Sequence, residues 1–406
     1  MIVRKNYLDK LISWKDHDII KVITGIRRCG KSTLLKQFQN YLTDNGVTEE
    51  QIISINFEDL EFEDLLDYRS LYKYVKNNLL PDKKMYVFLD EIQKVSNFEK
   101  AVDSLYIQKN VDVYITGSNA YMLSSDLSTL LSGRYIEISM LPLSFKEVYE
   151  EKGGDKEEVF NQYLKYGGFP YLTAISLDEE QTNMYLEGIY NTVIIKDIEE
   201  RENRKNLDPN KRKITDIVLL KSIARYLAST IGSIVSVKNV TGYLTSNGRK
   251  VSASTVDDYM EALREAFIFY PVERFDISGK KMLKTLNKWY IVDLALRDYM
   301  VPKKTYDLGF SLENTVYFDL IRRGYRVSIG KTETAEVDFV AQKNGEMIYY
   351  QVSASMLDQR TFERELLPLR SIKDNYKKIV LTLDKFTQGN YEGIKVVNAI
   401  DWLLEN

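Results

Sequence analysis

The chain has 406 residues, which is more than one hydrophobic core usually holds, so two to four domains are expected. Lys and Arg total 56 against 59 Asp and Glu, and the resulting formal net charge of -3 lacks the basic character of an obligate nucleic-acid coat. One Cys and one His exclude an internal disulfide, a cysteine-cluster zinc site and a Cys–His triad, which leaves carboxylates, Lys, Arg and a metal ion for chemistry.

The N-terminus is charged from Arg4 onward and lacks the apolar core of a signal peptide. No run of 18 apolar residues occurs anywhere in the chain. These two features predict a cytoplasmic protein without a membrane span.

Short apolar runs bounded by turn residues recur in the first third of the chain and predict strands. These runs are Ile19–Ile26, Ile52–Phe57, Met85–Leu89, Val111–Thr116 and Tyr135–Met140. Longer stretches with helical spacing separate them. Because strands that alternate with helices form a parallel sheet covered on both faces, residues 1–145 are predicted to form one α/β domain.

The segment Gly25-Ile-Arg-Arg-Cys-Gly-Lys-Ser32 matches the P-loop pattern without a gap. It follows an apolar run and precedes a helical stretch, so loop N–H groups and a helix N-terminus would face a phosphate. The predicted ligands are ATP and Mg²⁺, with Lys31 reaching the β- and γ-phosphates and the Ser32 hydroxyl binding the metal. The predicted nucleotide contacts are Gly25, Ile26, Arg27, Arg28, Cys29, Gly30, Lys31, Ser32 and Thr33.

A second motif, Tyr86-Val-Phe-Leu-Asp-Glu91, is an apolar strand that ends in two acids. Asp90 is predicted to hold Mg²⁺ through water, and Glu91 to polarise the water that attacks the phosphate. The adjacent Glu favours an ATP hydrolase over a passive nucleotide holder.

Other candidates for the phosphate site follow weaker patterns. Ser118 or Asn119, at the end of Val113-Tyr-Ile-Thr-Gly-Ser-Asn119, would orient the lytic water, although an ordinary polar turn remains the alternative. Arg134 is a candidate arginine finger. The alternative is that Arg134 is a surface residue that pairs with a carboxylate. Asn56, at the end of the second predicted strand, would contact and gate Glu91.

The rest of the chain divides by pattern into three further segments. Residues 146–206 are predicted to be a helical lid that ends in a charged linker, 197–205. Residues 207–304 contain three helical patterns and two β-rich runs, Phe269–Phe275 and Met282–Val292, which are typical of a winged-helix-like unit. Residues 305–406 return to an α/β pattern, with elements at Leu312–Arg323, Tyr325–Ile329, Val337–Gln342, Met347–Ser353, Gln359–Ile372 and Lys378–Leu383.

These motifs, together with Leu141-Pro-Leu-Ser-Phe-Lys-Glu147, resemble prokaryotic AAA+-type P-loop ATPases that carry a C-terminal domain of unknown function. The likeness extends over nearly the whole chain, including Tyr166-Gly-Gly-Phe-Pro170. It implies a central parallel sheet, a helical lid after Pro142, a winged helix and a last domain related to restriction endonucleases.

The last domain departs from the metal-binding pattern of such nucleases, which use a helix Glu, a strand Asp and then Glu-x-Lys on the next strand. Glu313 and Asp338 match, but the next strand reads Gln351-Val-Ser353, so an amide and a hydroxyl replace the carboxylate and the Lys. Glu336 lies on the same strand face as Asp338 and would restore one charge. The domain is predicted to be non-catalytic, with an ATP-powered nuclease as an alternative.

The predicted winged helix gives mixed signals about its partner. Its third helix is acidic, which phosphates would repel, and this favours a protein partner. The hairpin that follows carries lysines that would contact phosphates in DNA: Lys280, Lys281, Lys284 and Lys288. We therefore expect Mg²⁺-dependent ATP hydrolysis that moves C-terminal domains bound to an unknown protein or to DNA, with possible homo-oligomers; a nucleotide-gated adaptor with little turnover is the alternative.

Overall fold

The computed structural model describes residues 2–117, 131, 133–175, 178–193, 198, 216–301, 307–333 and 335–405. The chain forms two compact units. Unit 1 is built on Met1–Pro142, and unit 2 on Leu143–Tyr190, Ile214–Arg264 and Ile268–Asn406. The four-part division at residues 145, 206 and 304 stays a prediction. Every helix within the described ranges is too short or too polar to cross a lipid bilayer.

Unit 1 contains a parallel sheet of five strands in the order β2-β3-β4-β1-β5. The strands are β1 (Ile20–Thr24), β2 (Ile52–Asn56), β3 (Met85–Asp90), β4 (Val111–Gly117) and β5 (Tyr135–Ser139). Side chains of β1, β3 and β4 are buried on both faces, as expected for the central strands of a parallel sheet. The parallel α/β fold expected for this part of the chain is confirmed.

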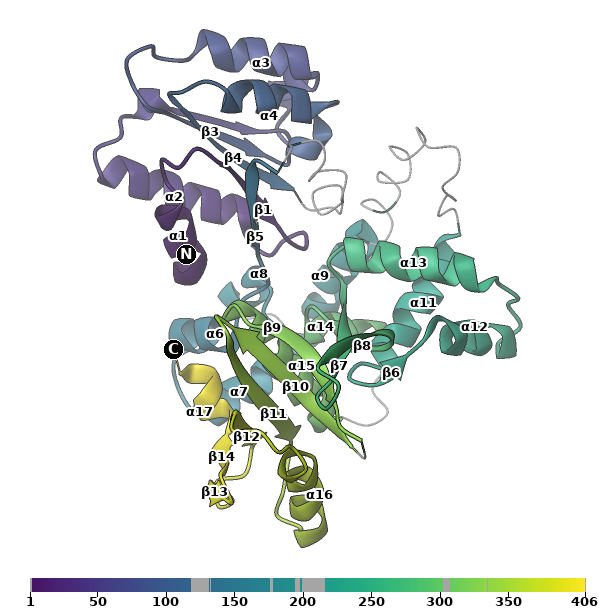
Figure 1. The fold of residues 1–406 in the computed structure, drawn as a ribbon. Helices are drawn as coiled ribbons and strands as arrows, with labels where there is room; N and C mark the ends of the chain where they lie inside the picture. Colours follow the sequence, from purple (N-terminus) through teal and green to yellow (C-terminus); the bar gives the residue numbers. More distant parts are fainter. Residues whose placement is uncertain are drawn as a thin grey trace. The chain divides into compact units, whose positions relative to one another are not determined.

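Helices cover both faces of this sheet (Figure 1). They are α1 (Lys5–Ser13), α2 (Lys31–Asp44), α3 (Tyr68–Asn77) and α4 (Phe98–Tyr106), with short 3-10 helices at Glu49–Gln51, Leu60–Leu65 and Ile92–Lys94. On one face α3 and α4 bury Leu71 and Leu105 against the apolar strands. On the other, Phe38 of α2 contacts Phe88 and Tyr114.

The strand order decides which loops meet. Strand β4 lies between β1 and β3, and all three run in the same direction. The carboxyl ends of parallel strands lie at one edge of the sheet, where ligands of such sheets bind. The P-loop after β1, the acids at the end of β3 and the end of β4 therefore share the carboxyl edge of the sheet.

Unit 2 contains a nine-stranded sheet in the order β13-β14-β12-β11-β10-β9-β7-β8-β6. The strands are β6 (Ile234–Val235), β7 (Phe269–Asp276), β8 (Lys281–Ile291), β9 (Arg326–Lys331), β10 (Glu336–Lys343), β11 (Glu346–Ser353), β12 (Lys377–Thr382), β13 (Gly389–Tyr391) and β14 (Ile394–Asn398). The predicted hairpin is the β7–β8 pair, and β7 also pairs with β9 in parallel. The hairpin and the C-terminal strands are therefore parts of a single sheet.

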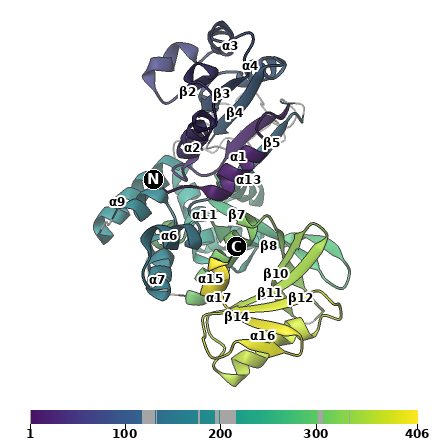
Figure 2. The ribbon, with the colours of Figure 1, turned by 90° about the vertical axis from the view of Figure 1, so that its left-hand side faces the viewer.

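The helices of unit 2 match most of the predicted helical segments. They are α6 (Phe145–Lys152), α7 (Lys156–Tyr166), α8 (Pro170–Ala174), α9 (Glu179–Asn191), α11 (Ile217–Ser229), α12 (Val237–Ser246), α13 (Ala253–Glu265), α14 (Leu294–Met300), α15 (Leu308–Arg322), α16 (Gln359–Arg370) and α17 (Ala399–Leu404). Helices α15 and α16 lie on opposite faces of the strands around β11 (Figure 2). The winged-helix and endonuclease-like descriptions of this unit stay predictions, and the predicted linker 197–205, apart from Ile198, lies outside the described residues.

Candidate functional site

The P-loop connects β1 to α2 through residues that take left-handed backbone conformations. Gly25, Arg28 and Gly30 have φ values of 145°, 69° and 104°. A Cβ on Gly25 would lie 2.1 Å from the carbonyl oxygen of Met140, so only glycine fits at this turn. The loop thus brings its backbone close to the end of β5 before α2 begins at Lys31.

Lys31 lies at the centre of the loop and is buried. Its Nζ donates to the carbonyl oxygens of Gly25 at 3.0 Å and Ile26 at 3.3 Å. The same Nζ is 4.0 Å from Oε1 of Glu91. The ammonium is therefore placed between the loop backbone and the acids of β3, where it would contact the phosphates of a nucleotide held by the loop.

The other predicted loop contacts divide into buried and exposed residues. Ile26 and Cys29 are fully buried, and burial raises the pKa of the Cys29 thiol. Arg27 pairs with Glu58, with Nη1 2.9 Å from Oε1. Ser32 is exposed, and its side chain hydrogen-bonds Asp90. Cys29 is therefore a packing residue of the loop, while Ser32 faces the acids.

Asp90 ends β3 with 7% of its surface exposed, and it accepts a hydrogen bond from the Thr116 hydroxyl. Burial and then the charge of Glu91 raise the pKa of Asp90, against the hydrogen bonds from Ser32 and Thr116, which lower it. A hydroxyl beside a carboxylate offers the hard oxygen ligands that Mg²⁺ takes.

The donor set also fits the way Mg²⁺ binds nucleotides. Among the residues described, no three His, Cys, Asp or Glu side chains lie close enough together to hold a metal by themselves. Nucleotide-bound Mg²⁺ needs only one or two protein oxygens, because phosphates and water complete its shell. Ser32 and Asp90 would supply that share.

Glu91 follows Asp90 with a left-handed backbone, at φ 54° and ψ 44°, which is uncommon for a non-glycine residue and typical of functional sites. Only 6% of it is exposed. The amide Nε2 of Gln93 donates to Oε2 of Glu91, and the backbone N–H of Glu91 donates to Oγ1 of Thr116 at 3.0 Å. The carboxylate is thereby held beside Lys31 at the carboxyl edge.

Two residues in this arrangement were not assigned a role from the sequence. Thr116 bridges Asp90 and the backbone of Glu91, whereas the sequence pattern points to Ser118 and Asn119 further along the chain. Gln93 binds the Glu91 carboxylate from two residues further along the chain. A Thr at the end of a strand does not by itself predict a site residue. Its role can be recognised only once β4 is known to lie beside β3.

The remaining sequence candidates lie elsewhere. Ser118 and Asn119 are outside the described residues, so their predicted role stays a prediction. The Oδ1 of Asn56 accepts the backbone N–H of Glu58 at 2.9 Å, and its gating role also stays a prediction.

Arg134 lies at the opposite edge of the sheet from the P-loop. Its carbonyl oxygen accepts the N–H of Ile20, the first residue of β1, at 2.9 Å. The five residues of β1 separate this position from the loop, which is about 16 Å along a strand. The guanidinium is exposed and lies over the Tyr106 ring, 5.6 Å from its centroid. Arg134 is therefore remote from the P-loop of its own chain.

In unit 2 the structure brings together the acids that the sequence had singled out. Glu313 of α15 and both Glu336 and Asp338 of β10 lie around the ammonium of Lys288 on β8. Gln351 bridges Asp338 and α16, since its Oε1 accepts the backbone N–H of Asp338 at 3.3 Å and its Nε2 donates to Oε2 of Glu365 at 2.9 Å.

The hydroxyl of Ser353 is also engaged, because it donates to the carbonyl oxygen of Ser355 at 3.0 Å. The proposed phosphate contact of Lys288 is wrong, because this lysine is 5% exposed and bonded to carboxylates.

Replacing Asp338 with Asn is expected to flatten the pH dependence of unit 2 stability. Burial, followed by the charge of Glu313, raises the pKa of Asp338 to about 8. The folded protein then binds this proton more tightly than the unfolded chain does. Asp338 therefore contributes stability that is complete below the ordinary Asp pKa of about 4 and is lost as the pH rises to about 8.

The expected slope is at most about 1.4 kcal/mol per pH unit. Urea unfolding of the full chain between about pH 5 and about pH 8 measures it, with the exposed Glu346→Gln as control. An unchanged slope in Asp338→Asn would show that Asp338 is ionised throughout this range.

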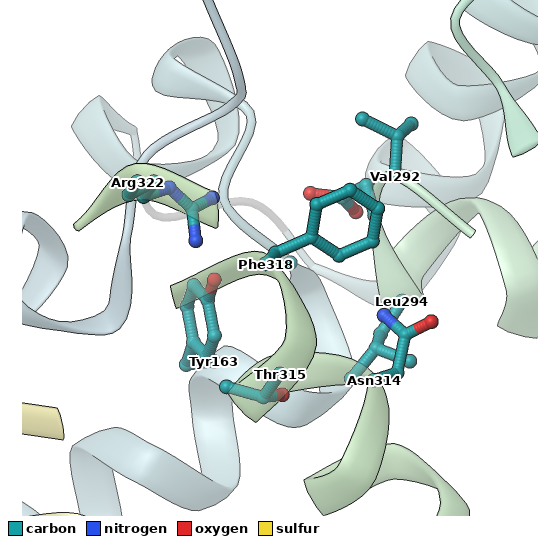
Figure 3. Close-up of a pocket in the computed structure, with 9 residues that line it drawn as sticks. Tyr163, Val292, Leu294, Asn314, Thr315, Phe318 and Arg322 are labelled. Carbon is teal, nitrogen blue, oxygen red and sulfur yellow. The ribbon is translucent and has the colours of Figure 1, made fainter. Parts of the chain in front are cut away.

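Two cavities of unit 2 differ in what they can hold. One of about 10 Å³, lined by Tyr163, Asn314, Phe318 and Arg322, admits about one water molecule (Figure 3). The other, of about 460 Å³, lies between α13 and the β7–β8 hairpin. Its lining combines acids and bases with apolar residues, including Asp257, Glu261, Glu273, Arg264, Met260 and Trp289. Of these two cavities, the larger has room for part of another molecule.

Comparison with known proteins identifies related sequences across the whole chain. A family model described as "AAA domain" matches residues 17–149, and one described as "Domain of unknown function (DUF8612)" matches residues 157–307. An uncharacterized protein of Haemophilus influenzae is 40% identical over 411 residues, which cover 100% of this chain and 99% of that protein. The uncharacterized protein MJ1544 of Methanocaldococcus jannaschii is 29% identical over 404 residues, 93% of this chain and 84% of that protein.

Likenesses to solved structures are weaker. The Walker-type ATPase PABY2304 of Pyrococcus abyssi gives a TM-score of 0.49 at 16% identity, over 74% of this chain and 96% of that chain. Cdc6p from Pyrobaculum aerophilum gives a TM-score of 0.30 at 11% identity, over 73% of this chain and 92% of that chain.

Proposed function

Since the chain belongs to the same family as the full-length Haemophilus influenzae protein and matches an AAA domain over residues 17–149, we propose that it is a Mg²⁺-dependent ATP hydrolase. The observation that carries the proposal is the carboxyl edge of the unit 1 sheet. There Lys31 and Ser32 of the P-loop meet Asp90 and Glu91 at the end of β3.

The roles of the residues follow from their contacts. Lys31 would exchange the carbonyl oxygens of Gly25 and Ile26 for the β- and γ-phosphate oxygens. Ser32 and Asp90 would hold Mg²⁺, which supplies positive charge to the phosphates. Thr116 hydrogen-bonds both Asp90 and the backbone of Glu91, so it positions the metal ligand relative to the catalytic carboxylate.

Hydrolysis, as opposed to binding alone, is assigned to Glu91. Its carboxylate lies next to Lys31 and accepts a hydrogen bond from Gln93. A carboxylate at this place would accept a proton from the attacking water as the bond to phosphorus forms. An adaptor that only binds nucleotide would not need a buried acid with an uncommon backbone conformation.

Phosphate release from ATP by the purified full chain tests the proposal. Release is expected in Mg²⁺ and should stop when EDTA removes the metal, because Asp90 and Ser32 then lack their shared cation. Tight ATP binding without release, with or without DNA, would support the nucleotide-gated adaptor.

Arg134 is expected to act on the nucleotide of a neighbouring copy, so specific activity should rise with protein concentration. The reason is its place at the far edge of the sheet, exposed and remote from its own P-loop. A guanidinium supplied in trans typically raises phosphoryl transfer by about 10³-fold or more. The measurement is turnover across a concentration series, together with the mass of the particle in solution.

Arg69→Ala is the matched control, because Arg69 is also exposed and lies over a tyrosine ring, 5.5 Å from the Tyr68 centroid. Arg134→Ala should lower turnover and Arg69→Ala should not. A flat concentration profile from a strictly monomeric protein would leave Arg134 without a catalytic role.

For unit 2 we propose a protein partner, not DNA. The exposed face of α13 carries Asp257 and Asp258, and Asp257 also lines the 460 Å³ cavity beside the hairpin. Acids at this place repel phosphates, while the apolar side chains of Met260 and Trp289 suit a protein side chain. Capture of partners by the full chain, with Asp257→Lys as the control, tests this assignment.

A further inference from the structure

Lys288 is a lysine whose charge is buried. It lies on β8, and only 5% of its surface is exposed. Its Nζ is 2.8 Å from Oε1 of Glu336, 3.0 Å from Oε1 of Glu313 and 3.6 Å from Oδ1 of Asp338. We call these three acids the carboxylate cluster. An ammonium without water needs several acceptors, and the cluster provides them from α15 and β10.

The cluster keeps this ammonium charged. Burial lowers the pKa of Lys288, but the charges of Glu313 and Glu336, and of Asp338 once it is ionised, outweigh burial and raise the pKa above its ordinary value. The hydroxyl of Tyr290 donates to Oε1 of Glu313 at 2.6 Å, which satisfies a further carboxylate lone pair. Lys288 therefore lies within hydrogen-bond distance of two carboxylates of the cluster, where its positive charge is balanced.

The ammonium lies among carboxyl oxygens, which are also the ligands that divalent metal ions prefer. Mg²⁺ takes oxygen ligands at about 2.1 Å, usually one or two carboxylates with water completing the shell. Here the central atom is a nitrogen at hydrogen-bond distances. No three acidic, His or Cys side chains of the described residues converge tightly enough for a metal.

We propose that the ammonium of Lys288 occupies the cation position of the carboxylate cluster as a built-in replacement for a divalent metal ion. The proposal concerns unit 2 and is independent of ATP hydrolysis in unit 1. It rests on the contacts of Lys288, not on the resemblance to restriction endonucleases.

Two features of β11 support the view that the cation of this cluster is the lysine ammonium and not a metal ion. Gln351 and Ser353 add no charge to the site, and the side-chain amide of Gln351 is held by the backbone N–H of Asp338 and by the carboxylate of Glu365 on α16. Asp338 is held in place by the backbone N–H of Val352, which donates to Oδ2 at 2.9 Å. Lys288 also joins the β7–β8 hairpin to α15 and β10, so the cation fixes how these elements pack.

A fixed ammonium cannot act as a metal would on nucleic acid. It has no open coordination position for a phosphate oxygen, and it cannot lower the pKa of a bound water as a divalent ion does. Unit 2 is therefore expected to bind its partner without cutting it.

Removing the ammonium should convert the cluster into a site for a divalent cation. Lys288→Met retains most of the apolar stem and leaves the three carboxyl groups of the cluster facing a space of the size of the ammonium. Thermal unfolding of the full chain is followed with Mn²⁺ and with EDTA, without nucleotide. Every protein in the series carries Asp90→Asn, so that Mn²⁺ at the phosphate site cannot contribute.

Mn²⁺ should raise the melting temperature of Lys288→Met and leave that of the parent with Lys288 unchanged. The matched control is Lys281→Met, an exposed lysine on the same strand, which should show no response to Mn²⁺. Adding Asp338→Asn to Lys288→Met should remove the response, because one metal ligand is lost. Absence of a Mn²⁺ response in a folded Lys288→Met would overturn the proposal.

A measurement on the unaltered protein covers the case in which Lys288→Met does not fold. Reductive methylation with formaldehyde labels accessible amines, and mass spectrometry of the peptides compares Lys288 with Lys281. Labelling of Lys288 should be at least about tenfold slower, because it needs local opening of the fold, and Mn²⁺ should not change it. Faster labelling of Lys288 in Mn²⁺ would mean that a metal displaces the ammonium, and it would overturn the proposal.

Discussion

Replacing Glu91 with Gln is expected to stop ATP hydrolysis and to leave ATP binding intact. The amide has nearly the same volume as the carboxylate and can still hydrogen-bond Gln93, so the fold around β3 should persist. It cannot accept a proton from the attacking water. Loss of a general base of this kind lowers turnover by about 10²- to 10⁴-fold.

Steady-state phosphate release and equilibrium binding of ATP, measured on one preparation, separate these two effects. Glu50→Gln is the matched control, because Glu50 is exposed and precedes β2 at the amino edge of the sheet. A Glu91→Gln protein that hydrolyses ATP at the wild-type rate would assign the catalytic carboxylate elsewhere. Loss of binding as well would mean that Glu91 supports the structure of the loop.

Replacing Lys31 with Ala is expected to abolish detectable ATP binding. Its ammonium is buried within hydrogen-bond distance of the carbonyl oxygens of Gly25 and Ile26. The phosphates of ATP would bring several negative charges into this region. Lys31 is the buried cation that the loop offers to balance them. Truncation of one partner in a buried charge pair costs about 2–5 kcal/mol, which weakens binding by roughly 30-fold to several thousand-fold.

Titration with ATP in the presence of Mg²⁺ measures this loss. Lys36→Ala is the matched control, since Lys36 lies on the same helix with its side chain exposed. Its affinity should equal that of the wild type. Lys31→Ala with an affinity within about threefold of the wild type would place the nucleotide away from this loop.

The sequence was sufficient for those parts of the site that depend on local pattern. The strand before Gly25, the helix that begins at Lys31 and the acids that end β3 all follow from spacing along the chain. The roles of Thr116 and Gln93 could not be predicted from spacing along the chain. They depend on β4 lying beside β3 and on the left-handed backbone of Glu91, which are properties of the folded sheet.

Parts of unit 2 were likewise not predictable from local sequence pattern. The alternation of apolar residues was enough to predict β10 and β11, but the two- and three-residue strands β6 and β13 carry too little pattern to be recognised. Lys288 looked solvated because other lysines precede it in the hairpin. Its burial follows from Glu313 and Asp338, which reach it only because β7 joins the C-terminal strands.

Single-turnover hydrolysis of γ-labelled ATP, with the full wild-type chain in excess over ATP, is the most direct test of the central claim. Because product release does not limit this measurement, it reports whether the residues at the carboxyl edge perform the chemistry at all. We expect complete conversion of bound ATP to ADP and phosphate in Mg²⁺, and intact bound ATP in Glu91→Gln. Wild-type protein that binds ATP stoichiometrically and leaves it uncleaved in Mg²⁺ would contradict the account.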